Sequence, residues 1–218
     1  MLIRFMIDNI LRLLLWLLCY VIITTIINGI VMGALHVRFA LQCKAQEFVI
    51  TKANRFEMQN GNQCAGFAAA YLLRHLDIEK DGDRLYEVIS NKMKDGCVRP
   101  KGIIKLLSQY GFQAKYCVGN LTALKKEVSK GSPVIVLIRT WKNQNWLHFV
   151  PVVGYDENYI YIAESLKELV NCNERYYNRK IAVGEFRKLW NTSMWKMPCY
   201  RNTYIWVKQR KQKRNEEA

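Results

Sequence analysis

Three side chains that lie far apart in the sequence have the types and spacing for nucleophilic chemistry, and the first is Cys64. The polar loop QNGNQ, residues 59–63, delivers this cysteine to the start of the apolar run CAGFAAAYLL. Cysteine attacks as the thiolate, and the unpaired N–H groups of a helix N-terminus favour negative charge there. The alternative is a buried helix that merely begins with a cysteine. The approach through a polar loop makes Cys64 a candidate nucleophile.

His148 is the candidate base, because a cysteine nucleophile needs a proton acceptor and imidazole serves near neutral pH. It begins the apolar run HFVPVVGY, where a lone histidine could also be structural. The polar residues 156–158 then predict a hairpin turn. If the turn is centred on Asp156, His148 and Glu164 lie eight residues to either side and face each other, with Cβ atoms ~5 Å apart. We expect Glu164 to orient the imidazole, with Ser165 or Asp156 as substitutes if the register shifts by one.

An acyl-transfer site also needs hydrogen-bond donors for the developing oxyanion. The backbone N–H of Cys64 is one natural donor. A side-chain amide just upstream is the second, and Gln59 is preferred because a five-residue loop can fold back over the site. Gln63 is the alternative, unless it caps the helix or is exposed.

The periodicity of the apolar residues predicts the elements that position these side chains. Helices are expected over residues 64–76, 83–94, 100–110, 121–130 and 183–191. Strands are expected over residues 113–118, 134–141, 147–155, 159–165 and 203–208. Helices therefore come first and an antiparallel sheet second, which is an α+β arrangement. The polar segment 171–180 is expected near the site as a rim loop.

The motifs QNGNQCAGFAAAYLLRH and HFVPVVGYDENYIYIAES resemble the papain-like superfamily. The resemblance is greater to the bacteriocin-processing peptidases, which remove double-glycine leaders, and to their stand-alone relatives, and it covers roughly residues 55–210. Those families typically have Asp-Cys-Gly at the nucleophile and Asp-Pro at the acid. This chain has Gln63 before the cysteine, Ala65-Gly66 after it, and Glu164-Ser165 at the acid. The resemblance implies a papain-like fold, N-terminal helices packed on an antiparallel sheet, and peptidase activity without a metal or organic cofactor.

The composition of this 218-residue chain limits the kinds of partner that can be expected. Its formal net charge of +15 and the basic run KQRKQKR at 208–214 favour anionic surroundings, such as phospholipid headgroups or acidic peptides. Arginine-glycine repeats and zinc-knuckle spacings are absent from the sequence, so no specific nucleic-acid partner is expected. The seven cysteines are odd in number and contain no CxxC pair, which argues against a disulfide framework and a structural zinc site.

The apolar run from Leu13 to Val37 is long enough to cross a bilayer with some tilt. Its length and poor cleavage site favour an uncleaved anchor over a signal peptide. We therefore expect a tail over residues 1–12, a membrane anchor over 13–37, a connector over 38–54, a peptidase domain over 55–209 and a charged tail over 210–218. This makes a single-pass protein of the cell membrane that contacts lipid through its N-terminal helix. The side on which the domain lies and the oligomeric state stay open.

Three functions fit these observations. The first is a thiol peptidase that hydrolyses a peptide or protein substrate through an acyl-enzyme. A deamidase or transpeptidase would use the same residues with a different substrate or acceptor. A non-catalytic peptide-binding or accessory domain is the third, supported by Glu164 at the acid position and the unusual residues beside Cys64.

Overall fold

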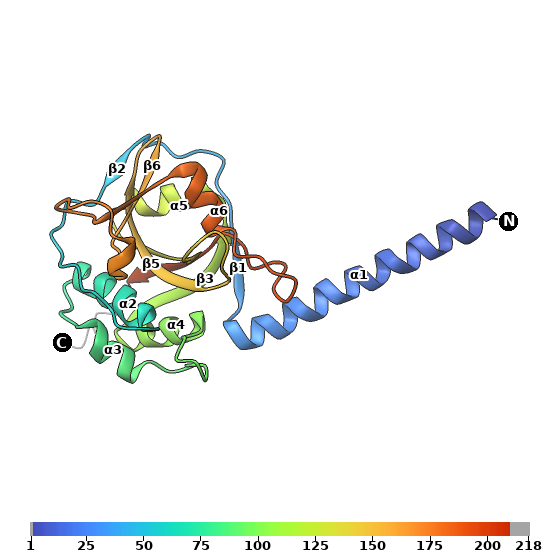
Figure 1. Cartoon of the computed structure of the whole chain (residues 1–218), viewed down its shortest axis with the longest axis horizontal. Coiled ribbons are helices and arrows are strands. Elements are labelled where there is room, and N and C mark those ends of the chain that lie inside the picture. Colours follow the sequence, from blue (N-terminus) through green and yellow to red (C-terminus); the bar gives the residue numbers. More distant parts are fainter. Residues whose placement is uncertain (1, 210–218) are drawn as a thin grey trace, which may run out of the picture.

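The computed structural model describes residues 2–209, and most of the basic run therefore lies outside the described residues. A curved sheet stands at the centre, with α2, α3 and α4 on one side and α5 and α6 on the other (Figure 1). The helices are α1 (Leu2–Met32), α2 (Cys64–His75), α3 (Gly82–Val88), α4 (Pro100–Gln109), α5 (Leu121–Val128) and α6 (Val183–Trp190), with a 3-10 turn at Lys167–Leu169.

The sheet has eight strands in the order β1-β3-β8-β4-β5-β6-β7, and β2 pairs with β5. All its pairs are antiparallel except β1 with β3. The strands are β1 (Leu35–Arg38), β2 (Phe48–Val49), β3 (Phe112–Gly119), β4 (Val134–Arg139), β5 (Leu147–Tyr155), β6 (Tyr159–Ile162), β7 (Arg179–Ala182) and β8 (Thr203–Gln209). The predicted α+β class, with helices before the main sheet, is confirmed.

Strand β4 lies at the centre of the sheet and has apolar cores on both faces. Ile135 and Leu137 pack into the cluster that holds α2 and α4, whereas Val136 and Ile138 pack into the cluster that holds α5 and α6. This explains the uninterrupted apolar run of the sequence, because a strand covered on both faces has no solvent side to carry polar residues. His148 pairs with Ile138 and is thereby built into this rigid centre.

Several elements differ from the sequence-based prediction. The strands β1, β2 and β7 were missed: β1 lies at the end of the apolar run assigned to the anchor, β2 has only two residues, and β7 begins within the polar segment 171–180. Residues 38–54, expected as a connector, thus contribute β2 to the sheet. Helix α3 ends at Val88 instead of near residue 94, since Asn91 adopts a left-handed conformation (φ 63°) and Lys92 bridges to Val98.

Helix α1 extends away from the domain (Figure 1). Its residues Arg4–Met32 are long and apolar enough to cross a membrane, with a mean hydropathy of 2.4 in the most apolar window. The helix ends at Met32, and Leu35–Arg38, which the sequence assigned largely to the anchor, form β1. Side chains from Arg4 to Tyr20 are exposed, whereas one face from Val21 to Met32 is half-buried against the domain.

Helices α2 and α3 cross where two glycines allow close contact. A Cβ atom on Gly66 would lie 2.5 Å from the Gly82 carbonyl oxygen and 2.7 Å from Tyr86 Cβ. Because Gly66 follows Cys64 by two residues, this contact also fixes the end of the helix that carries the cysteine.

We predict that Gly66→Ala destabilises the protein by about 1–3 kcal/mol, since the added methyl forces the helices apart. The matched control is Gly184→Ala in α6, where nothing lies within 4 Å of the new Cβ. That change should be neutral or stabilise by about 0.4–1 kcal/mol. Denaturant unfolding of the full chain in detergent measures both. Equal stabilities of the two variants would contradict the close contact.

Candidate active site

Cys64 is the first residue of α2, as predicted from the sequence. Gly61 takes a left-handed conformation (φ 63°), which lets the preceding loop turn tightly. The side chain of Gln63 closes this turn by accepting a hydrogen bond from the Asn60 N–H at 3.1 Å. Asn62 ties the loop to the Asp95 carbonyl at 2.7 Å. The cysteine is therefore held by a loop that is anchored at several points.

His148 and Glu164 are in direct contact. His148 Nε2 lies 2.6 Å from Glu164 Oε1, and the two residues are only 2% and 1% exposed. The bond to Glu164 occupies Nε2 and leaves Nδ1 free of that contact, and Cys64 lies close enough to the imidazole to help raise the pKa of His148. The structure thus brings together the three residues that the sequence singled out.

The register that was expected to join His148 and Glu164 is wrong. The turn is not centred on Asp156, because Tyr155 pairs with Ile160. In that register Glu164 would face the opposite side of the sheet from His148. An irregularity between Val152 and Gly154 shifts the pairing by one residue.

The shifted register continues past the end of β6, where the Ala163 N–H donates to the Pro151 carbonyl at 3.0 Å. It puts Glu164 opposite Val150, two residues from His148 and on the same face. Such diagonal neighbours lie about 7–8 Å apart, a gap that only long side chains cross. The long side chain of Glu164 crosses this distance and reaches the His148 ring.

The charges of this pair stabilise each other. Burial alone would lower the pKa of His148, but the facing Glu164 carboxylate and the hydrogen bonds to Cys64 and Glu164 outweigh it and raise the pKa. Burial would likewise raise the pKa of Glu164, but His148 and Arg179 lower it. The carboxylate therefore stabilises positive charge on the imidazole whenever the ring holds an extra proton.

Two residues that hold Glu164 were missed in the sequence. Arg179 donates to Glu164 Oε2 at 2.7 Å, and Asn178 brackets the Glu164 backbone with bonds of 2.6 and 2.9 Å. Both belong to the polar stretch expected as a rim loop, where nothing in the pattern marks an arginine for burial. Oε1 also accepts the backbone N–H groups of Ser165 (2.8 Å) and Leu166 (2.9 Å).

Gln59 lies near Glu164 and is held by Ser165, the residue that follows Glu164 in the sequence. Ser165 Oγ donates to Gln59 Oε1 at 2.7 Å, and the Gln59 N–H donates to the Ser165 carbonyl at 2.9 Å. Ser165 therefore positions Gln59 and does not replace Glu164. Gln59 Nε2 donates to the Gly61 carbonyl at 2.6 Å, which uses one of its two hydrogens. Among residues 2–209, the second hydrogen has no partner.

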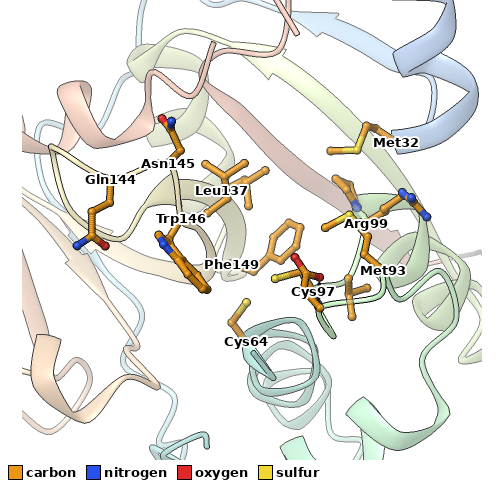
Figure 2. Close-up of a pocket in the computed structure, with 14 residues that line it drawn as sticks. Met32, Cys64, Met93, Cys97, Arg99, Leu137, Gln144, Asn145, Trp146 and Phe149 are labelled. Carbon is orange, nitrogen blue, oxygen red and sulfur yellow. Dashed lines mark hydrogen bonds between the residues drawn. The ribbon is translucent and has the colours of Figure 1, made fainter. Parts of the chain in front are cut away.

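The Cys64 side chain points into a cavity of about 550 Å³ (Figure 2). Phe149 and Trp146 stand above the sulfur in this view, and Met32, the last residue of α1, lies across the cavity. Cys97 lines the same cavity, and burial raises the pKa of its thiol to about 11. The lining is mostly apolar, and its polar side chains are Asp95, Arg99, Gln144 and Asn145.

The chain matches the model of a family described as Peptidase_C39 like over residues 46–194. It belongs to this family. The match includes all four candidate residues and confirms the resemblance to the bacteriocin-processing peptidases. The protein is thus a cysteine peptidase by family. Curated protein sequences give no match.

Solved structures agree on the fold of this C39-like peptidase. The peptidase domain of Streptococcus ComA, a bi-functional ABC transporter involved in quorum sensing, is 17% identical with a TM-score of 0.54 over 70% of this chain and 96% of that one. A putative C39-like peptidase from Bacillus anthracis is 17% identical with a TM-score of 0.56, over 76% and 99%.

A double glycine motif protease from the AMS/PCAT transporter, in complex with the leader peptide, is also similar in structure. It is 19% identical with a TM-score of 0.52, over 74% of this chain and 97% of that one. The cysteine protease CMS1MS2 of Carica candamarcensis, in complex with E-64, has a TM-score of 0.55 at 12% identity, over 76% and 99%. The expected papain-like fold is confirmed.

We predict a pH-dependent stability loss for Glu164→Gln in this C39-like peptidase. The lowered pKa of Glu164 stabilises the fold above about pH 4.3, and this contribution is lost as the pH falls. The raised pKa of His148 contributes fully below about pH 6.5, and this is lost as the pH rises. The variant should therefore lose most between these values, by about 3–5 kcal/mol.

Denaturant unfolding of the full chain from pH 3.5 to 9 checks this. Glu79→Gln removes an exposed carboxylate that pairs with Arg55, and it should cost less than about 1 kcal/mol. A Glu164→Gln loss that is the same at every pH would show that the charge pairing is not its cause.

Proposed function

We propose that this chain is a membrane-anchored thiol peptidase in which Cys64 is the nucleophile, His148 the base and Glu164 the residue that orients the imidazole. The contact between His148 and Glu164 carries the proposal. It fixes the ring through Nε2, and the other nitrogen would then serve the thiol. Both residues are buried, which holds this arrangement without substrate.

Acylation would begin when the Cys64 thiol gives its proton to His148 and the sulfur attacks the scissile carbonyl carbon. The carbonyl π electrons move to oxygen and form a tetrahedral oxyanion. As the oxyanion collapses, the C–N bond breaks and the imidazolium protonates the leaving amine. A thioester on Cys64 remains. Throughout, the Glu164 carboxylate stabilises the positive ring.

Water would then complete the reaction. The neutral imidazole of His148 takes a proton from a water molecule, which attacks the thioester carbonyl. The second tetrahedral intermediate expels the Cys64 sulfur, which recovers the proton, and releases a carboxylic acid. The cycle consumes one water for each peptide bond broken.

Gln59 and the Cys64 backbone N–H are the proposed donors to both oxyanions. Gln59 is held on its oxygen side by Ser165, so its amide nitrogen keeps a fixed direction with one free hydrogen. Gln63 instead uses its oxygen to close the preceding loop. This difference favours Gln59 for the role.

The substrate is proposed to be a peptide or protein. The apolar cavity beside Cys64 has room for at least one large side chain next to the scissile bond. The complex of a similar protease with a leader peptide supports peptide binding at this fold. Residues 55–209 would form the peptidase domain, and a span within Arg4–Met32 of α1 would hold it at the cell membrane.

We predict that Cys64→Ala abolishes labelling of the full chain by a thiol-reactive peptide electrophile and stops peptide hydrolysis. The fold should persist, because Cys64 contributes little to the core. Cys97→Ala is the matched control, since this second cysteine lines the same cavity, and it should still be labelled. In-gel detection of the label, with circular dichroism for the fold, checks both. Labelling of Cys64→Ala at the wild-type level would reject the nucleophile.

We also predict that Gln59→Ala lowers kcat by about 10²–10³, because an oxyanion donor acts on the transition state. Gln63→Ala should change kcat far less. Steady-state hydrolysis of a fluorogenic peptide measures both variants. If Gln63→Ala caused the larger fall in kcat, the two glutamines would have to exchange roles.

A further inference from the structure

A tight turn on the domain lies directly against α1. The segment that follows α6 reaches toward the helix (Figure 1). At its base, Thr192 Oγ1 bonds the Tyr200 carbonyl at 2.9 Å, and at its tip the Met197 N–H bonds the Met194 carbonyl at 2.9 Å. The corner residues Trp195 and Lys196 therefore project outward from an ordered loop.

The backbone of this turn is paired with α1. Tyr20 Oη donates to the Trp195 carbonyl, and Asn28 Nδ2 donates to the Lys196 carbonyl at 2.7 Å. Thr25 Oγ1 lies 3.4 Å from Cys199 Sγ. Both corner carbonyls are thus satisfied by the helix, as carbonyls must be where backbone lies in a water-poor environment.

The length of α1 fixes the level of the turn relative to a bilayer. A hydrocarbon core of about 30 Å takes about 20 helical residues, whereas Arg4–Met32 has 29. Every 20-residue window within this range contains Tyr20. Because Tyr20 bonds the Trp195 carbonyl, the turn lies at or inside the membrane boundary wherever α1 spans.

The side chains of the turn suit the interface between lipid and water. Trp195 is 72% exposed, and the Lys196 ammonium lies 5.2 Å from the centre of its ring. Tryptophan concentrates at headgroup level, and lysine extends its ammonium toward water and anionic phosphates. A deep position is unfavourable for Lys196 and for the polar backbone of the turn. The shallow windows, which end near Thr24, keep the turn at the interface, and their cost is that the N-terminal half of the span contains Asp8 and Arg12.

We propose that the turn Met194–Met197 is a second membrane contact, seated in the headgroup layer of the bilayer that α1 crosses. The proposal rests on the membrane anchoring proposed above and is independent of the peptidase chemistry. The turn would set how deep α1 sits and hold the domain in one orientation at the lipid surface. The occupant of this surface is phospholipid.

Fluorescence quenching by brominated phospholipids tests the proposal. The full chain is placed in phosphatidylcholine–phosphatidylglycerol vesicles whose acyl chains carry bromine either near the headgroup or near the bilayer centre. Trp195→Phe should remove part of the quenching by shallow bromine. Trp206→Phe is the matched control, because its indole is half-buried against Arg38 and Glu127 and should contribute no quenching.

Trp16, which is 76% exposed on α1, reports on the anchor in the same experiment. Trp16→Phe should reduce the quenching by bromine near the bilayer centre. If Trp16 is quenched and Trp195→Phe behaves like Trp206→Phe, the turn is not in the membrane and the inference is overturned while the anchor stands. If Trp16 is not quenched either, both the anchor and the inference are wrong. Neither result bears on peptide hydrolysis.

Discussion

The buried carboxylate of Glu164 is the constraint on which the site depends. It binds His148 on one oxygen and Arg179 on the other, and it accepts two backbone N–H groups besides. A charge in this position is stable only with all its partners, because an unpaired buried carboxylate costs several kcal/mol. The same residue also links the parts of the site, since its neighbour Ser165 holds Gln59.

The departures from the family pattern explain one another. His148 and Glu164 are offset by two residues, so they are farther apart than two directly opposite residues would be. A glutamate side chain is long enough to cross this distance. The carboxylate also accepts a hydrogen bond from the backbone N–H of Ser165, and a proline at this position would have no N–H to donate. Glu164-Ser165 is therefore a coherent substitute for Asp-Pro. The sequence predicted the contact between His148 and Glu164 from a register that is wrong. The irregularity between Val152 and Gly154, which puts both residues on one face, cannot be recognised in the sequence pattern.

The sequence predicted long elements and residue types well, and it failed where tertiary pairing decides. Strands β4 and β5 and helices α2 and α4 follow from periodicity and from breakers such as Pro100. The burial of Arg179 depends on a partner that is 15 residues away in sequence, and the docking of α1 depends on a turn more than 160 residues away. Met32, the last residue of α1, lines the cavity of Cys64, so this helix contributes to the wall of the proposed active site.

The kinetics of Glu164→Asp test the central claim most directly. The shorter side chain keeps the charge but does not span the offset to His148 while remaining bonded to Arg179. We predict that kcat/KM for peptide hydrolysis falls by about 10²–10⁴, the usual worth of acid–base assistance, measured on protein that circular dichroism shows to be folded. Wild-type kcat/KM in this variant would contradict the account, because it would mean that the length of Glu164 and its position across the strands do not matter.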